Sequence, residues 1–139
     1  MSKLLVDTNV LIYSKDTSSV FHKASINLLN TGSDQLFVAS KSLSEYFAVV
    51  TRGQVPLLTP SEALNDIQEF VMYFEVLYPS LISYQKLLEL IKKYTPKGLK
   101  IHDFEIASIA LVNGITKIAT FNRSDFQQIG ETEVVIPYN

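Results

Sequence analysis

Strand-like and helix-like segments alternate along this chain, and that alternation constrains its fold more than any other feature. Short apolar runs that predict strands occur at residues 4–6, 36–39, 76–78, 117–120 and 134–136. Between them, apolar residues recur at the spacing of amphipathic helices. Such alternation is typical of a parallel sheet with helices on its faces. We therefore predict an α/β protein with five mostly parallel strands.

The clearest helix start is the sequence Thr-Pro-Ser-Glu at residues 59–62. It combines an N-cap residue, a proline at the first helical position and a glutamate three residues after the cap. Further helices are predicted at residues 43–50, 25–30 and 84–94, each followed by a glycine or proline that ends it. No linker interrupts the chain, so we predict one domain over residues 1–139, with a flexible loop at 94–100.

The composition excludes several kinds of site. The five glycines are scattered singly and form no phosphate-binding loop, so a Walker-type nucleotide site is not expected. Cysteine is absent and only two histidines occur, which leaves oxygen ligands, and therefore a hard cation, for any metal site. The formal net charge of −2 predicts no general basic surface. Neither a signal sequence nor an apolar run of membrane length is present, so we expect a cytoplasmic protein.

Three carboxylates, Asp7, Glu45 and Asp103, each lie where a predicted strand passes into a helix. Ligands of open α/β sheets bind outside the carboxyl ends of the strands, so these residues predict one acidic, metal-binding pocket. Asp103 carries the most weight, because the apolar stripe of its helix begins three residues later and places its side chain on the inward face. Local alternatives remain open for the other two. Asp7 could simply cap a helix, and Glu45 could close a capping box with Ser42.

A fourth polar cluster follows the predicted strand at 117–120. Thr120, Asn122 and Asp125 are placed to face the same crevice, although turns use these residue types for local reasons as well. Glu105 falls off the inward stripe of its helix and is interpreted as a solvated charge. Neither histidine has a partner at ligand spacing, so both are interpreted as structural or exposed.

Four sequence blocks together resemble the PIN domain, especially the VapC-like toxin ribonucleases. They are Val-Asp-Thr-Asn-Val-Leu-Ile at 6–12, Ser-Leu-Ser-Glu-Tyr-Phe at 42–47, Ile-His-Asp-Phe-Glu-Ile-Ala-Ser at 101–108 and Thr-Phe-Asn-Arg-Ser-Asp-Phe at 120–126. The blocks occur in the family's order and span essentially the whole chain. The resemblance implies a three-layer α/β/α sandwich with a central parallel sheet, Mg²⁺ or Mn²⁺ held by the acidic cluster, and hydrolysis of RNA phosphodiester bonds.

Asp7, Glu45 and Asp103 match the first three acidic positions of that family. Carboxylates suit the hydrolysis of a polyanion, because the reaction uses a hard divalent cation and such a cation requires oxygen ligands. We assign Asp7 and Asp103 as the main metal ligands, and Glu45 as a ligand through water or as the group that orients the attacking water. The chain departs from the family at the fourth acidic position. Asn122 stands where the family often has Asp, and Asp125 is a further candidate ligand.

Supporting roles follow from the same resemblance. The neutral groups expected around the ligands are Asn9, Thr120 and Asn122, and the candidate contacts to RNA phosphates are Lys97, Lys100 and Arg123. Expected partners are the RNA substrate, a second copy of the chain in a homodimer, and a small antitoxin protein, since VapC-like proteins are toxins of toxin–antitoxin pairs. We expect the antitoxin to meet the helix after Thr59 or the helix at 43–50.

Two other functions remain open. A haloacid-dehalogenase-type phosphatase also places its nucleophile after the first strand. Its Asp-x-Asp pattern is not met, because Asp7 is followed by Thr8 and Asn9. A catalytically weak PIN-like module that acts as a binding partner is kept open by Asn122.

Overall fold

A parallel sheet of five strands forms the centre of the computed structural model, which describes residues 2–139. The strands are β1 (Ser2–Val6), β2 (Asp34–Ala39), β3 (Glu75–Leu77), β4 (Lys117–Ala119) and β5 (Glu133–Val135). Their order in the sheet is β3-β2-β1-β4-β5, and every neighbouring pair is parallel. All five predicted strands are confirmed, and the sheet is parallel throughout.

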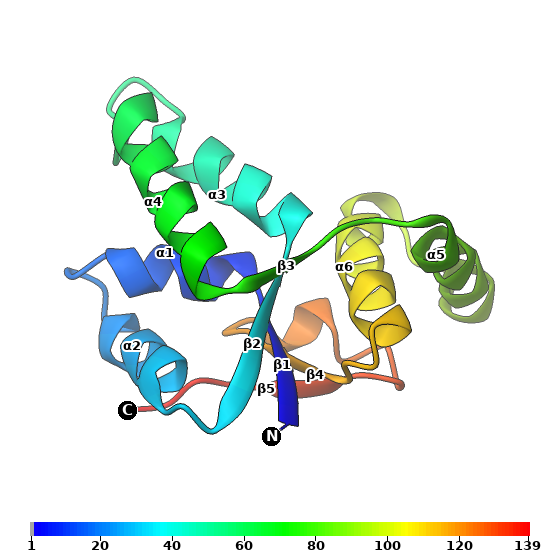
Figure 1. Ribbon diagram of the computed structural model, residues 1–139. Coiled ribbons are helices and arrows are strands. Elements are labelled where there is room, and N and C mark those ends of the chain that lie inside the picture. Colours follow the sequence, from blue (N-terminus) through cyan, green and yellow to red (C-terminus); the bar gives the residue numbers. More distant parts are fainter. Residues whose placement is uncertain (1) are drawn as a thin grey trace.

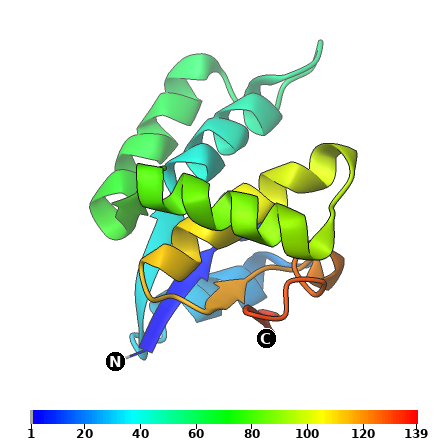
Figure 2. The same cartoon turned by 90° about the vertical axis from the view of Figure 1, so that its right-hand side faces the viewer.

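Within residues 2–139, six α-helices cover the two faces of this sheet. They are α1 (Thr8–Lys15), α2 (His22–Asn30), α3 (Ser40–Thr51), α4 (Pro60–Tyr73), α5 (Leu81–Tyr94) and α6 (Ile101–Val112). In Figure 1, α1 and α2 lie to the left of the sheet and α5 and α6 to its right, while the α3–α4 pair extends above it. Figure 2 looks onto the α5 and α6 side. The predicted three-layer α/β/α sandwich is confirmed.

The sequence of β1 explains why the protein has two cores. Leu4 and Val6 belong to the core on the side of α1 to α4, whereas Leu5 belongs to the core on the side of α5 and α6. Each of the three is at most 2% exposed. A strand covered on both faces is expected to read as a continuous apolar run, as Leu-Leu-Val does here.

The helix boundaries show which local signals decide them. Helix α4 begins as predicted, because Thr59 and Glu62 form a reciprocal capping box. Helix α5 begins at residue 81 instead of 84, because Ser80 and Ser83 form a second capping box that the prediction missed. The predicted loop at 94–100 contains the short 3₁₀ helix η1 (Gly98–Lys100), which leads directly into α6.

The strand order fixes where a ligand can bind. From β1 the chain moves to β2 and β3 on one side and then crosses to β4 and β5 on the other. The carboxyl ends of β1 and β4 therefore form the switch point of the sheet, the usual binding crevice of open α/β folds. Asp7 directly follows β1, and Thr120 directly follows β4.

None of the helices in the described part of the chain is long and apolar enough to cross a membrane.

Candidate active site

Asp7 lies between β1 and α1 and is only 6% exposed. Its Oδ1 accepts a hydrogen bond from the backbone N–H of Thr8 at 2.8 Å, and its Oδ2 accepts one from the hydroxyl of Thr120 at 2.9 Å. Asp7 therefore is the N-cap of α1, as one interpretation of the sequence held. An ionised carboxylate can accept about four hydrogen bonds. The cap thus leaves acceptor capacity on Asp7.

The Thr120 hydroxyl links the two strand ends of the crevice. It donates to Asp7 and accepts hydrogen bonds from Nδ2 of Asn9 at 3.0 Å and from the backbone N–H of Asn122 at 3.1 Å. The Oδ1 of Asn9 in turn accepts from the backbone N–H of Phe121 at 3.2 Å. One donor and two acceptor positions are all that a hydroxyl offers. The fully buried Thr120 hydroxyl is therefore saturated, and it fixes Asp7 against the end of β4.

Glu45 is directed toward the start of α1. Its Oε2 accepts a hydrogen bond from the hydroxyl of Thr8 at 3.0 Å. The alternative interpretation, a capping box with Ser42, is wrong because α3 begins at residue 40 after the N-cap Ala39. Ser42 therefore lies inside the helix, and its buried hydroxyl has no hydrogen-bond partner among residues 2–139. Thr8 is a site residue that the sequence analysis missed, since nothing in its surroundings distinguishes it from an ordinary first-turn threonine.

The other two acidic groups come from the second half of the chain. Asp103 lies in the first turn of α6, and its side chain is 23% exposed. Asp125 ends the 3₁₀ helix η2 (Arg123–Asp125), where its Oδ1 accepts a hydrogen bond from Nδ2 of Asn122 at 2.9 Å. The side chain of Asn122 is thus used within the turn. Of Asn122 and Asp125, only Asp125 carries a negative charge.

Electrostatics links these carboxylates into one group. Burial raises the pKa of Asp7 to about 6, while the hydrogen bonds from Thr8 and Thr120 oppose the shift. Burial also raises the pKa of Asp103 to about 7, with a further contribution from the negative charge of Asp125. Asp125 and Glu45 act on both groups in the same direction. Repulsion of this kind indicates that the crevice favours bound positive charge.

The crevice is not a closed metal cage. Within residues 2–139, no group of three or more Asp, Glu or His side chains is arranged so that it could hold a metal ion by itself. Mg²⁺, however, keeps several waters and usually takes only one or two carboxylates, and Mn²⁺ suits the same oxygen ligands. Asp7, after β1, and Asp103, in the first turn of α6, supply such hard oxygens. The donor set fits a partly hydrated divalent cation.

The three cationic candidates differ in their surroundings. Lys97 and Arg123 are exposed, and their side chains form no ion pair within residues 2–139. Lys100 instead lies against the acidic groups. Its Nζ donates to the carbonyl oxygen of Ser124 at 2.5 Å and lies 3.8 Å from Oδ2 of Asp103.

Glu105 is partly solvated, with its side chain 35% exposed, but it also has ion-pair partners that the sequence did not predict. Its Oε1 accepts a hydrogen bond from Nζ of Lys41 at 2.9 Å, and Nδ1 of His102 lies 3.4 Å from the same oxygen. The same lysine donates to Nδ1 of His102 at 2.5 Å. The Lys41–Glu105 pair joins the first turn of α3 to α6 across 64 positions, which helix periodicity alone does not predict.

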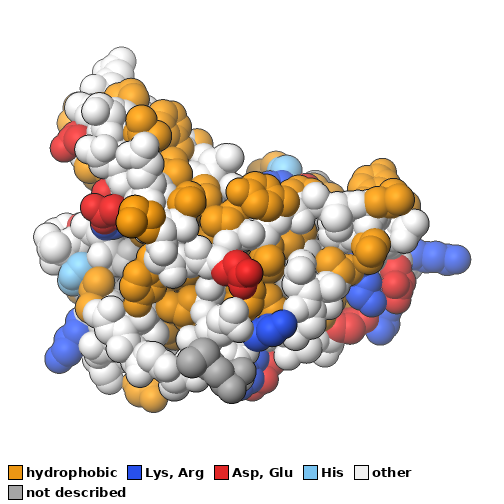
Figure 3. All heavy atoms as spheres, in the orientation of Figure 1, with side chains coloured by type: hydrophobic (Ala, Val, Ile, Leu, Met, Phe, Trp, Pro, Cys, Tyr) orange, Lys and Arg blue, Asp and Glu red, His pale blue; other side chains and the backbone are white. Residues whose placement is uncertain are grey.

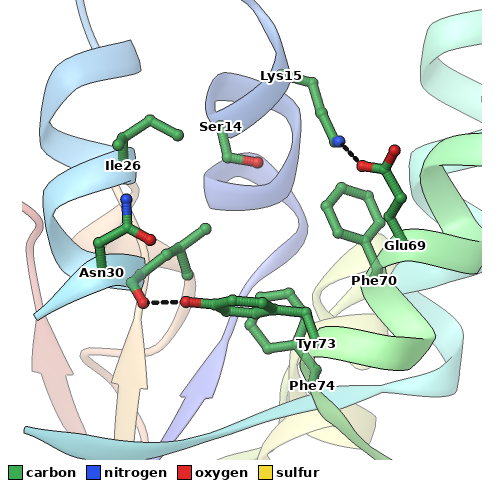
Figure 4. A pocket seen from close by; sticks show the side chains of 9 residues that line it. Ser14, Lys15, Ile26, Asn30, Glu69, Phe70, Tyr73 and Phe74 are labelled. Carbon is green, nitrogen blue, oxygen red and sulfur yellow. Dashed lines mark hydrogen bonds and ion pairs between the residues drawn. The ribbon is translucent and has the colours of Figure 1, made fainter. Parts of the chain in front are cut away.

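A separate pocket of about 180 Å³ lies between α1, α2 and α4 (Figure 4). Its apolar lining includes Leu29, Phe70 and Phe74. Lys15 and Glu69 form an ion pair at its edge. The Tyr73 hydroxyl crosses to α2 and donates to the carbonyl oxygen of Leu29. Helix α4, predicted as a contact surface for a partner, thus contributes one wall of a pocket.

Residues 4–131 match the PIN domain family. This chain therefore belongs to that family. No curated protein sequence matches it.

Solved structures of similar fold include toxin–antitoxin proteins. VapBC2 from Rickettsia felis, solved bound to a DNA fragment from its promoter, has a TM-score of 0.73 and 18% identity, with 96% of this chain and 97% of that chain covered. VapC20 from Mycobacterium tuberculosis, described as a sarcin-ricin-loop-cleaving toxin, has a TM-score of 0.74 and 14% identity over 92% and 95% of the two chains. DNA-bound VapBC from Salmonella typhimurium has a TM-score of 0.71 and 24% identity, with 98% of each chain covered. At these identities the likeness establishes a common fold.

Proposed function

We propose that this PIN-domain protein is a Mg²⁺- or Mn²⁺-dependent endoribonuclease and the toxin of a toxin–antitoxin pair. One observation carries the proposal. Asp7 follows β1 and Asp103 lies in the first turn of α6, and burial together with neighbouring carboxylates raises the pKa of each. Perturbed acids in a crevice at the strand ends are the usual mark of a functional site. Membership of the PIN family supports a nuclease.

Each residue of the crevice has a separate role in the proposed hydrolysis. A divalent cation held by Asp7 and Asp103 would lower the pKa of a water molecule and offset the negative charge of the transition state. Glu45, whose Oε2 accepts a hydrogen bond from the Thr8 hydroxyl, would accept a proton from the attacking water. Thr120 and Asn9 hold Asp7 in one orientation. Asp125 adds negative charge beside both ligands.

The proposed substrate is RNA. Lys97 and Arg123 lie in the segments that precede α6 and follow β4, so they flank the crevice and remain available for phosphate groups. VapC20, which shares the fold, is described as cleaving the sarcin-ricin loop.

The proposed antitoxin contact is the pocket of Figure 4. Several proteins of similar fold were solved as VapBC or toxin–antitoxin complexes. The aromatic side chains of Phe70, Tyr73 and Phe74 offer an apolar seat, and the Lys15–Glu69 ion pair offers polar contacts at its edge. An apolar side chain of a small protein fits this chemistry.

A second apolar surface supports the proposed homodimer. Figure 3 shows hydrophobic side chains reaching the surface along α4 and near α5. Between the end of α4 and the start of α5, the exposed apolar residues include Val71, Met72, Tyr78, Leu81 and Ile82. Apolar patches of this kind mark protein interfaces. Met72→Glu and Ile82→Glu should shift a dimer toward monomer in light scattering coupled to gel filtration.

The second candidate function, a weakly catalytic binding module, is favoured by the open arrangement of the acids and by Asn122 at the fourth position. A cleavage assay distinguishes the two. The purified protein should cut RNA with Mg²⁺ or Mn²⁺ but not in excess EDTA, and Asp7→Asn and Asp103→Asn should each lower the rate by about 10² or more. Asp16→Asn, at the other end of α1, is the matched control. Cleavage that persists in EDTA, or survives both substitutions, excludes the proposed mechanism.

A further inference from the structure

Lys100 occupies a position that the proposed mechanism does not use. It ends η1, immediately before α6, and its side chain is only 25% exposed. Its Nζ donates to the carbonyl oxygen of Ser124 at 2.5 Å and lies 3.8 Å from Oδ2 of Asp103. Ser124 directly precedes Asp125. One ammonium group therefore contacts both of the segments that bring Asp103 and Asp125 to the crevice.

The charges around Asp103 make this contact more than a surface ion pair. Within residues 2–139, Lys100 is the cation that pairs with Asp103, at 3.8 Å, and no ion pair engages the side chains of Asp7, Glu45 or Asp125. Lys41, the lysine at the start of α3, is engaged by Glu105 instead. A lysine that served only to contact RNA would extend its ammonium group into solvent. The ammonium group of Lys100 instead turns back toward Asp103 and the Ser124 carbonyl.

We propose that Lys100 is a positioning residue that acts as an internal counter-ion of the acidic crevice, an inference that rests on the proposed function. In the metal-free protein it holds the Asp125 turn against the start of α6 and neutralises part of the carboxylate charge. A divalent cation bound at Asp103 meets the positive charge of Lys100 at short range, so the two compete for the same carboxylates. The flexible four-carbon stem of lysine allows the ammonium group to withdraw into solvent.

This role predicts an unusual result, namely that loss of a site residue tightens metal binding. Lys100→Met and Lys100→Gln should each bind Mn²⁺ about tenfold more tightly than wild type, because the competing charge is gone. Both metal-free variants should melt at a lower temperature than wild type, since the carboxylates then lack their counter-ion. Lys100→Gln removes the charge but retains a donor for the Ser124 carbonyl. It therefore distinguishes the effect of losing the charge from the effect of losing the hydrogen bond. Lys100→Arg retains the charge and should bind Mn²⁺ as wild type does.

Lys86→Met is a matched control. Lys86 lies on α5, forms an ion pair with Glu89 three residues later at 3.4 Å, and is 27% exposed, close to the geometry of the Lys100–Asp103 pair. Its substitution changes the net charge equally but lies outside the crevice, so Mn²⁺ affinity should not change. Isothermal titration calorimetry on the metal-free full chain measures all five proteins.

The outcomes separate this inference from the proposed function. If wild type binds Mn²⁺ but both neutral variants bind it equally or more weakly, Lys100 is not a counter-ion, and the nuclease proposal stands. If Lys100→Arg tightens binding as much as Lys100→Met, charge is not the cause, and the inference fails. If wild type binds neither Mn²⁺ nor Mg²⁺, both the inference and the proposed function are overturned.

Discussion

Thr120 donates its hydroxyl hydrogen to Oδ2 of Asp7 at 2.9 Å, across 113 positions of the chain. The same hydroxyl accepts hydrogen bonds from Asn9 and from the backbone of Asn122. Thr120 thus joins the end of β4 to the end of β1 and also fixes the orientation of Asp7. The contact stabilises the ionised form of Asp7 and opposes the effect of burial on its pKa.

Thr120→Val should therefore cost stability and weaken the site. The substitution keeps the shape of the side chain but leaves the part-buried donors of Asn9 and Asn122 without their acceptor, a loss of about 1 kcal/mol. It also removes a hydrogen bond to the Asp7 carboxylate, so Mn²⁺ should bind more weakly at neutral pH. Urea unfolding and calorimetry measure the two effects. Thr120→Ser retains the hydroxyl and should remain close to wild type. Equal stability of the Val and Ser variants would contradict the proposed network.

The stability of the metal-free protein should fall as the pH rises from about 5 to 7. The pKa of Asp7 is about 6 and that of Asp103 about 7, both above the ordinary value of 3.8, so each group holds its proton more tightly in the folded chain. By proton linkage, the stability that such groups contribute to the folded protein is lost as the pH rises from their unfolded pKa toward their folded pKa. Carboxyl groups with a lowered pKa, such as Glu62, titrate below this window.

Urea unfolding in EDTA at pH 5, 6 and 7 measures this slope. Mn²⁺ should reduce the loss, because a bound cation stabilises the ionised carboxylates. The double variant Asp7→Asn and Asp103→Asn should show little slope in this window, and Mn²⁺ should not stabilise it. A metal-free wild type that gains stability between pH 5 and 7 relative to the double variant is the contrary result.

Much of this fold can be predicted from sequence because its signals are local. The apolar run of β1 and the Thr59 capping box each act within a few residues. The five strands follow from such signals, and so does the placement of Asp7 at a strand end. The α5 start was missed because Ser80 and Ser83 cap each other with residues that are common in loops.

The contacts within the site could not be predicted in the same way. The Thr8–Glu45 hydrogen bond spans 37 positions, and the tether from Lys100 to Ser124 spans 24. Nothing in the spacing of these residues distinguishes them from exposed neighbours. The capping-box sequence at Ser42 gave the wrong helix start, because α3 begins three residues earlier, after the N-cap Ala39. Such contacts depend on how α1, α3 and α6 meet above the sheet.

Glu45→Gln separates chemistry from structure at this position. The amide oxygen of Gln can still accept the Thr8 hydrogen bond, so the melting temperature should change little. Loss of the carboxylate should lower RNA cleavage by about 10² or more, the lower end of what a general base contributes. Ser42→Ala is the control for capping. Its hydroxyl has no partner, so its removal should leave stability unchanged or slightly raised. A Gln variant with nearly wild-type cleavage would remove Glu45 from the mechanism.

Asp125 and Asn122 give opposite predictions for the fourth acidic position. The charge of Asp125, like that of Glu45, acts on both Asp7 and Asp103, so Asp125→Asn should weaken Mn²⁺ binding and slow cleavage. Asn122→Asp places a second carboxylate at the position from which Asn122 donates to Asp125 at 2.9 Å, replacing a hydrogen bond with repulsion. The metal-free variant should therefore melt at a lower temperature than wild type, and added Mn²⁺ should produce a larger thermal shift.

Calorimetry and thermal melts with and without Mn²⁺ distinguish the two residues. If Asp125→Asn leaves affinity and cleavage unchanged, Asp125 is only a turn residue and the site uses three acids. If Asn122→Asp alters neither the melting temperature nor the response to Mn²⁺, position 122 faces away from the cation. The fourth acid is then Asp125, because its negative charge, in addition to that of Glu45, raises the pKa of both Asp7 and Asp103.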